Sequence, residues 1–257
     1  MKRLEMLLKL NEILLADMPQ SRRWATDFPL NIQSQWHLFR SLVNIRKPAQ
    51  IGGNFIELQY ELLKDIISEK GITDVNSLTP VYSNIYLWKG DITTLKIDGI
   101  VNAANSGLTG CYYPCHSCID NTIHTYAGIQ LRLECFDIMK RQGYPEPVGR
   151  AKITDSYNLP CRNVIHTVGP MVRGRLTRNE CEQLKSCYWS CLKLAEEKQL
   201  KSIAFCCVST GEFHFPKKEA AQIAVKTVKE YIKEHNKMKV LFDVFSDEDF
   251  SIYSNLI

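Results

Sequence analysis

Apolar residues recur at steps of three and four along the first quarter of the chain. The pattern covers three segments, residues 3–18, 32–46 and 54–71. Prolines and a Gly-Gly pair separate these segments. Because such spacing places apolar side chains on one face of a helix, it predicts an N-terminal helical extension over residues 1–72. We expect Trp24 and Trp36 to pack in the core of this extension rather than at an interface.

Beyond Gly71 the pattern changes to short apolar runs that alternate with amphipathic segments. The runs that predict strands are residues 85–90, 99–105, 151–158, 163–170, 202–209 and 240–246. The segments that predict helices are Asp120–Arg141, Asn179–Lys198, Lys217–Glu234 and Asp247–Asn255. Nearly continuous apolar strands between helices are typical of a mostly parallel sheet that is buried on both faces. We therefore predict a three-layer α/β/α domain over residues 73–257.

Composition narrows the classes of partner. The 257 residues are 45% hydrophobic and 23% charged, with a net charge of +4, which is ordinary for a globular protein. This charge suits a small anionic ligand but is too weak and too dispersed to indicate a nucleic-acid partner. No apolar run approaches the roughly 20 residues of a membrane span, and the N-terminal segment does not resemble a secretory signal. We expect an intracellular, cytoplasmic protein with no membrane partner.

Two predicted strand-to-helix loops carry unusual chemistry, at the edge of the sheet where ligands of such folds bind. One is "GCYYPCHSC", residues 110–118, and the other is "STGEFHFP", residues 209–216. The second loop contains a glycine and opens a helix, so its backbone N–H groups could hold a phosphate. A simple tight turn explains the same pattern.

The loop at 110–118 concentrates three of the ten cysteines and one histidine. Thiolate and imidazole ligands favour Zn²⁺ over Mg²⁺ or Ca²⁺. Four ligands on so short a loop, Cys115 among them, would strain a tetrahedral site. Cys111, His116 and Cys118 span the loop without that strain and leave one position open, as in catalytic zinc sites. A closed structural site, a reactive thiol and a fortuitous cluster are the alternatives.

Two polar residues follow this loop on the predicted helix. Asp120 lies near the helix start, where an acidic residue commonly acts as a cap. His124 lies one turn further along the same face. It can orient a carboxylate or pack against the sheet, and we favour packing.

Four segments together resemble the macrodomain family, whose members are ADP-ribose-binding α/β/α modules. They are "KGDITTLKIDGIVNAANSGLTG", "IDNTIHTYAG", "VIHTVGP" and "FCCVSTGEFHFPKKEAA", in the order of the family's motifs. Hydrolytic members usually carry a run of glycines where this chain has "CYYPCHSC". That replacement, with the helical extension, is similar to the zinc-containing macrodomains of bacteria, which are protein–ADP-ribose hydrolases. The resemblance implies a mixed, mostly parallel sheet and one Zn²⁺ per chain.

The resemblance also implies roles for individual residues. Asp91 would accept a hydrogen bond from the adenine amino group with the Ile92 backbone close by, and Asn105 would hold a hydroxyl of the distal ribose. Asp120 would be the catalytic carboxylate, with Asn105 beside it, and Phe245 would flank the adenine. The zinc ligands would be Cys111, His116 and Cys118. The remaining ADP-ribose contacts would come from Cys118, Ile119, Asp120, Ser209, Thr210, Gly211, Glu212 and Phe213.

These roles describe a zinc-dependent, glycosidase-type hydrolase that removes mono-ADP-ribose from modified acidic (Asp/Glu) side chains of proteins. The implied partners are ADP-ribose, the mono-ADP-ribosylated protein and a sirtuin-like ADP-ribosyltransferase system. The alternative is a non-catalytic reader that binds ADP-ribose and recruits a partner of the helical extension. A reader would need only the adenine and pyrophosphate contacts, so the metal loop and Asp120 favour the enzyme.

Overall fold

The computed structural model describes residues 1–235 and 237–257, except the side chains of Trp24 and Ala25. The predicted N-terminal helices are present. They are α1 (Arg3–Asp17), α3 (Ile32–Ile45) and α4 (Gly53–Lys70), with a 3₁₀ turn (Pro19–Ser21) and the short α2 (Arg22–Ala25) between the first two. Trp36 is half-buried and stacks on Phe39 within the extension, and its ring centre also lies 5.8 Å from that of Tyr126 in the sheet domain. The prediction for Trp24 lies outside the described residues.

A six-stranded sheet forms the centre of the molecule, and each of its strands was predicted. They are β2 (Ile85–Lys89), β4 (Gly99–Ala104), β5 (Ala151–Asp155), β6 (Asn163–Val168), β7 (Ser202–Phe205) and β8 (Lys239–Val244). The strand order is β2-β8-β7-β4-β6-β5, and all neighbours are parallel except β5, which is antiparallel to β6. This confirms the mixed, mostly parallel sheet. A two-stranded parallel pair, β1 (Thr73–Asp74) with β3 (Leu95–Lys96), lies outside it.

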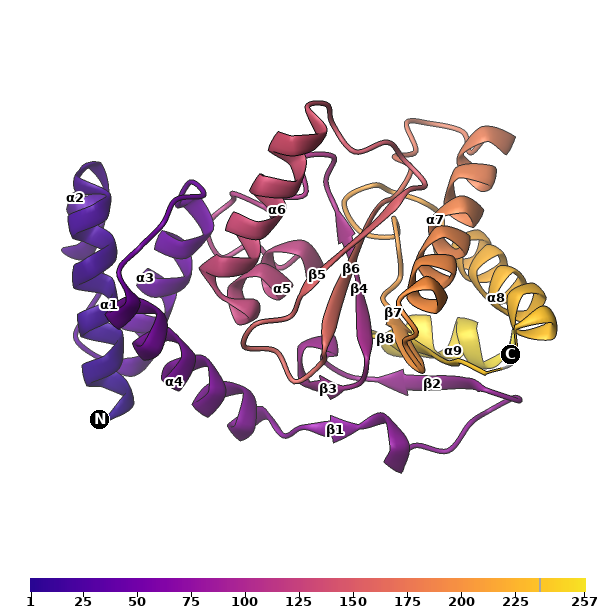
Figure 1. Cartoon of the computed structure of the whole chain (residues 1–257), viewed down its shortest axis with the longest axis horizontal. Helices are drawn as coiled ribbons and strands as arrows, with labels where there is room; N and C mark the ends of the chain where they lie inside the picture. Colours follow the sequence, from indigo (N-terminus) through magenta and orange to yellow (C-terminus); the bar gives the residue numbers. More distant parts are fainter. Residues whose placement is uncertain (236) are drawn as a thin grey trace.

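Helices cover both faces of this sheet and complete the three predicted layers. The remaining helices are α5 (Ile119–Ala127), α6 (Ile129–Gln142), α7 (Arg178–Glu197), α8 (Lys217–Glu234) and α9 (Asp247–Ser254), and 3₁₀ turns span Val75–Ser77 and Ile92–Thr94. In Figure 1, α5 and α6 lie on one side of the strands, and α7, α8 and α9 lie on the other. The helices of the extension pack outside α5 and α6, on the first side.

One helix prediction was wrong. The segment Asp120–Arg141 forms two helices, α5 and α6, because Gly128 interrupts it with a φ of 95°. A side chain at this position would also collide with its surroundings, since a Cβ would lie 2.4 Å from Gln59 Nε2 and 2.6 Å from Asn158 Nδ2. The break therefore depends on a left-handed backbone and on contacts with distant segments.

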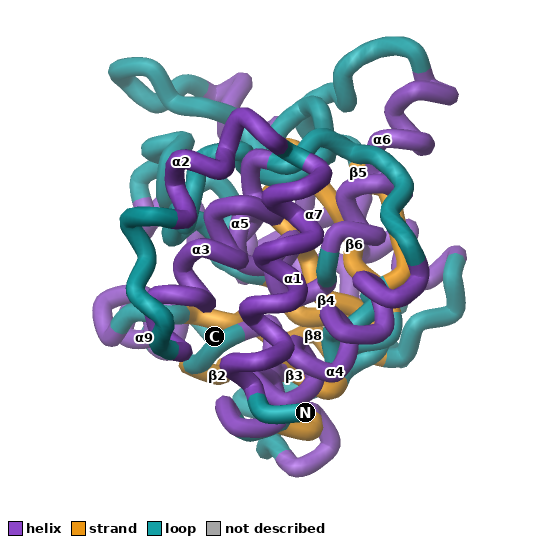
Figure 2. Tube along the Cα trace, turned by 90° about the vertical axis from the view of Figure 1, so that its left-hand side faces the viewer, coloured by secondary structure: helices purple, strands orange, loops and turns teal. Residues whose placement is uncertain are grey.

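The helical extension lies against the sheet domain through α3 and α4. Seen from the N-terminal side, α1 and α3 lie in front of α5 and the strands (Figure 2). The structure shows that α1 packs on α3 and α4, and that α3 and α4 pack on α5. The division of the chain at residue 72 stays a prediction. In the part of the chain that the structure describes, no helix is long and apolar enough to cross a membrane.

Candidate active site

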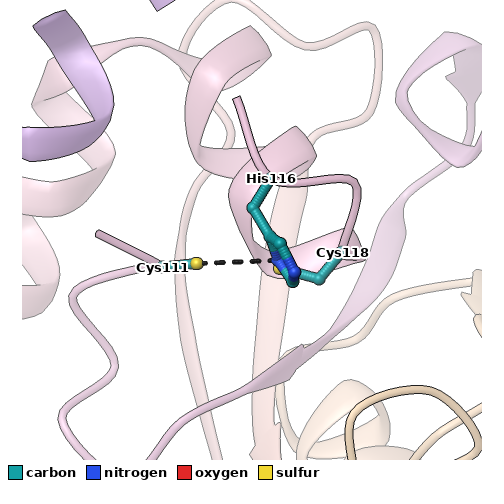
Figure 3. Close-up of side chains that lie close together, drawn as sticks. All are labelled: Cys111, His116 and Cys118. Atoms are coloured by element: carbon teal, nitrogen blue, oxygen red, sulfur yellow. Dashed lines mark hydrogen bonds between the residues drawn. The ribbon is translucent and has the colours of Figure 1, made fainter. Parts of the chain in front are cut away.

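The loop between β4 and α5 gathers three ligand-type side chains. One sulfur each from Cys111 and Cys118 and one ring nitrogen of His116 all lie within 4.8 Å of one another. Figure 3 shows the three side chains converging on one point, with Cys111 Sγ facing His116 Nδ1 at 3.8 Å. All three are half-buried. The other ring nitrogen of His116, Nε2, lies 3.5 Å from Glu212 Oε1 on the loop after β7.

Cys115 is the fourth sequence candidate, and its thiol points away from the other three. Its Sγ lies 3.3 Å from Ser41 Oγ and 3.5 Å from the His37 carbonyl oxygen, both on α3. Its backbone has a φ of 52°, an uncommon conformation for a residue with a side chain. The structure therefore brings together the three-residue set and leaves Cys115 outside it.

Asp120 lies in the first turn of α5, two residues beyond Cys118, and is 5% exposed. Its carboxylate is held from both sides by asparagine amides. Asn102 Nδ2 donates to Oδ1 at 2.8 Å, and Asn105 Nδ2 donates to Oδ2 at 3.1 Å. Burial raises the pKa of Asp120 to about 6, although these two donors and the nearby Arg132 act to lower it. Asn105 Nδ2 also donates to the Gly110 carbonyl oxygen at 3.1 Å, which ties the carboxylate to the start of the 110–118 loop.

A network of buried polar side chains extends beyond Asn102, and the sequence analysis did not predict it. Asn102 Nδ2 lies 3.2 Å from His166 Nδ1, and His166 Nε2 lies 3.0 Å from Thr154 Oγ1. Burial lowers the pKa of His166 to about 3, so the ring is neutral. A neutral ring that accepts from Asn102 at Nδ1 carries its proton on Nε2 and donates it to Thr154. The sequence feature that could have predicted this network is the asparagine within the apolar run 99–104, because a buried amide needs hydrogen-bond partners.

His124 also lies behind Asp120. It is 5% exposed, and its Nε2 is 3.6 Å from Asp120 Oδ1. Burial, followed by His166 and Arg132, lowers the pKa of His124 well below its usual value. The pair is therefore not an ion pair. Among the described residues neither ring nitrogen of His124 has a hydrogen-bond partner, which fits the packing role that we favoured.

His124, Cys135 and His166 each place one ligand-type atom within 4.8 Å of the others. Both ring nitrogens of His166 already lie within hydrogen-bonding distance of Asn102 and Thr154. We therefore interpret these three side chains as support for the Asp120 region rather than as a second metal site.

Asp91 lies just after β2, at the same edge of the sheet. Its Oδ1 accepts from the Thr93 backbone N–H at 3.0 Å and from Thr93 Oγ1 at 2.6 Å. Its Oδ2 accepts from Lys70 Nζ, at the end of α4, at 2.8 Å. Burial acts to raise the pKa of Asp91, but Lys70 and Thr93 outweigh it and the pKa is lowered. Ile92, which follows, is buried.

The loop after β7 holds the other predicted contacts. Ser209 is buried with a φ of 66°, and its Oγ has no hydrogen-bond partner among the described residues. A Cβ on Gly169, after β6, would lie 2.0 Å from that oxygen and 3.0 Å from Val208 Cγ1, so a larger residue there would displace the Ser209 side chain. Thr210 Oγ1 donates to the Cys207 carbonyl oxygen at 2.9 Å, and the Phe213 carbonyl oxygen accepts from Val172 at 2.9 Å.

The tip of this loop is open. A Cβ built on Gly211 would meet nothing within 4 Å. In the described part of the chain, the backbone N–H groups of Gly211, Glu212 and Phe213 donate to no protein acceptor. Successive unpaired backbone N–H groups in a loop suit an anionic ligand. Phe245 follows β8 and is 84% exposed.

All of these residues follow parallel strands at their carboxyl ends. Asp91 follows β2, Asn105 follows β4, the 209–213 loop follows β7 and Phe245 follows β8. The carboxyl edge of an open parallel sheet is where α/β proteins bind their ligands. The fold and the residues at this edge are those of a ligand-binding α/β/α domain. Its site combines a buried carboxylate with a cluster of two thiols and an imidazole, which are ligands of soft metal ions.

Comparison with known proteins gives this class a family. The Macro domain family matches residues 101–224. The chain is 49% identical over 251 residues to a protein named protein-ADP-ribose hydrolase of Treponema medium, covering 96% of this chain and 95% of the relative. It is 50% identical over 229 residues to the protein of the same name of Staphylococcus aureus strain MRSA252, covering 88% of this chain and 85% of the relative.

Solved structures agree. An Oceanobacillus iheyensis macrodomain with ADP superposes with a TM-score of 0.63 at 35% identity, covering 69% of this chain and 92% of that one. A Trypanosoma brucei macrodomain in complex with ADP superposes with a TM-score of 0.64 at 27% identity, covering 86% and 95%. The chain belongs to the macrodomain family.

Proposed function

We propose that this protein is a zinc-dependent hydrolase that removes mono-ADP-ribose from modified aspartate and glutamate side chains of proteins. One observation carries the proposal: a buried carboxylate, Asp120, is fixed by two asparagine amides beside the Cys111–His116–Cys118 cluster. The names of the relatives support hydrolysis of protein-bound ADP-ribose. The macrodomains with ADP support the nucleotide part of the ligand.

The cluster fits zinc by its chemistry. Two sulfurs and an imidazole nitrogen are the donor set that zinc prefers, and three protein ligands are the usual number in a catalytic site. The Glu212 carboxylate faces the far ring nitrogen of His116 at 3.5 Å, as outer carboxylates do in metal sites where they fix the ring orientation. Zinc held there would supply a Lewis acid for a ribose hydroxyl or a water molecule.

The rest of the ligand follows from the protein's own groups. The Asp91 carboxylate accepts a hydrogen bond from the adenine amino group. The open N–H groups of the 211–213 segment bind the pyrophosphate ahead of α8. Asn105 lies between the Gly110 carbonyl and Asp120, where it orients a hydroxyl of the distal ribose.

In the reaction, Asp120 orients a water molecule toward C1″ of the distal ribose. The water oxygen forms a bond to C1″, and the bond from C1″ to the carboxylate oxygen of the modified side chain breaks. That carboxylate leaves with the electron pair, and Asp120 accepts the proton of the water. The products are free ADP-ribose and the restored acidic side chain. Positioned proton acceptors of this kind contribute about 10²–10⁴-fold to rate.

The test uses a protein labelled with mono-ADP-ribose on acidic side chains. We expect the zinc-loaded chain to release the label, and a substrate labelled on arginine to keep it. If the zinc-loaded protein binds ADP-ribose but releases no label from any acidic-linked substrate, it is a reader and the enzyme proposal is wrong. Release from both substrates would contradict the acidic specificity alone.

A further inference from the structure

Helix α3 of the N-terminal extension presents polar side chains to the metal loop. One face of α3 carries Arg40, Ser41 and Asn44, which lie within about one helical turn of one another. This face contacts the 111–118 loop and α5. Asn44 is fully buried and Ser41 is 6% exposed. A buried amide is costly unless its hydrogen bonds are made, so the partners of these groups show what the face is for.

Arg40 and Asn44 hold the backbone on either side of the predicted ligand His116. Arg40 Nη2 donates to the His116 carbonyl oxygen at 2.7 Å and to Asn121 Oδ1 at 3.0 Å. Asn44 Oδ1 accepts from the Cys115 N–H at 2.9 Å, and Asn44 Nδ2 donates to Thr125 Oγ1 at 3.0 Å.

Two bonds therefore bracket the Cys115–His116 peptide. Cys115 has a φ of 52°, which is unfavourable for a residue with a side chain and needs outside support. Ser41 Oγ adds a third contact at 3.3 Å from Cys115 Sγ. Because the backbone conformation at Cys115 sets the direction in which His116 projects, α3 fixes the imidazole relative to the two sulfurs.

The other end of the ligand set is tied to the same helix. Arg132, on α6, is 4% exposed and donates through Nη1 to the carbonyl oxygens of Val43, Asn44 and Arg46 at the end of α3. Its Nη2 donates to the Cys111 carbonyl oxygen at 3.3 Å. The guanidinium also lies 4.3 Å from the centre of the Tyr112 ring. The backbone of Cys111 is thus joined through one side chain to the C-terminal end of α3.

We propose that α3 is a structural part of the metal site, with Arg40 and Asn44 as positioning residues that orient His116. The N-terminal helices then act within the catalytic domain. This inference rests on the proposed metal site where zinc affinity is the readout. Its second readout, amide hydrogen exchange of the loop, does not depend on metal.

The experiment compares Arg40→Ala and Asn44→Ala with a matched control, Asn11→Ala, in the full chain. Asn11 is a buried amide on the neighbouring helix, 2% exposed, and it donates to Gln35 rather than to the loop. The first readout is the zinc dissociation constant, measured by competition with a chelator. The second is amide hydrogen exchange of residues 111–118 in the metal-free protein.

We expect Arg40→Ala and Asn44→Ala to weaken zinc binding by about 10–100-fold, the usual effect of losing an outer-shell partner. Exchange at the loop amides should quicken in both variants. Arg40→Lys, which keeps a positively charged N–H donor group on a side chain of similar reach, should restore part of the affinity. Asn11→Ala should lower the unfolding midpoint with little change in either readout.

Unchanged loop exchange in both α3 variants would overturn the inference, as would an Asn11→Ala variant that weakens zinc equally. If the unaltered chain binds no zinc, the proposed metal site is wrong. The exchange rates then still decide whether α3 holds the loop.

Discussion

Replacing Asn102 by alanine should slow hydrolysis while leaving ADP-ribose binding nearly intact. Asn102 has no solvent exposure, and its Nδ2 donates to Asp120 Oδ1 at 2.8 Å. The variant removes one of the two amides that hold the carboxylate. His166 Nδ1 also loses the group from which it accepts.

The size of the effect follows from that hydrogen bond. A hydrogen bond to a charged group contributes about 1.5–3 kcal/mol, which corresponds to about 10- to 150-fold in rate if it acts in the transition state. Asn105 still holds Oδ2, so the carboxylate keeps one anchor. We expect kcat to decrease by a factor within this range. We expect KM to change by less than about threefold, since the adenine and pyrophosphate contacts are untouched.

The assay is release of labelled ADP-ribose from an acidic-linked protein over a range of substrate concentrations, which gives both kcat and KM, with ADP-ribose affinity measured by calorimetry. Asn11→Ala is the control, because it removes a comparably buried amide far from Asp120 and should lower stability without lowering kcat. An Asn102→Ala variant with unaltered kcat would refute the view that Asn102 orients Asp120. A loss confined to KM would point to a binding role instead.

Three further predictions test the site. We propose about one zinc per chain. Combined replacement of Cys111 and Cys118 by alanine should remove this zinc, which elemental analysis would show; unchanged metal content would exclude this ligand set. Asp120→Ala should abolish label release while ADP-ribose binding stays within about tenfold; residual turnover at the unaltered rate would remove Asp120 from the mechanism. Gly110→Ala should lower the free energy of unfolding in urea by about 1–3 kcal/mol. Gly110 has a φ of 81° and its Cβ would lie 2.8 Å from the His124 ring, whereas Gly143 has a φ of 79° and open space, so an equal loss in Gly143→Ala would show that only backbone strain matters.

Local sequence pattern was enough to predict every strand of the main sheet, because each strand lies within a short run of mostly apolar residues. The same pattern could not predict the break at Gly128. Apolar spacing runs through it without interruption, and the break depends on Gln59 and Asn158, which come from segments far away in the chain. The short β1–β3 pair was missed for a related reason, since two residues per strand carry no periodicity.

The cluster of Cys111, His116 and Cys118 was predictable because these three residues lie within eight positions of one another. Spacing alone left open which of the three cysteines lies outside the ligand cluster. In the structure this cysteine is Cys115, because its side chain and backbone contact α3. Cys115 is engaged by Ser41, His37 and Asn44, residues that precede it by more than seventy positions. No pattern within the loop could indicate those partners.

Contacts between distant segments also explain why the helical extension, whose role could not be inferred from the sequence, lies close to the site. In the sequence, Arg40 and Asn44 are two polar residues on an amphipathic helix, where a solvent-exposed face is the ordinary interpretation. In the structure Asn44 is fully buried, and Arg40 bonds to the backbone carbonyl of His116. A polar residue that is buried at a helix–loop contact must find partners on the other side, and here these partners are the backbone of a predicted ligand and the first turns of α5. The extension and the loop therefore depend on one another: residues 111–118 contain no glycine, so the left-handed backbone of Cys115 needs support from outside the loop, and α3 provides it.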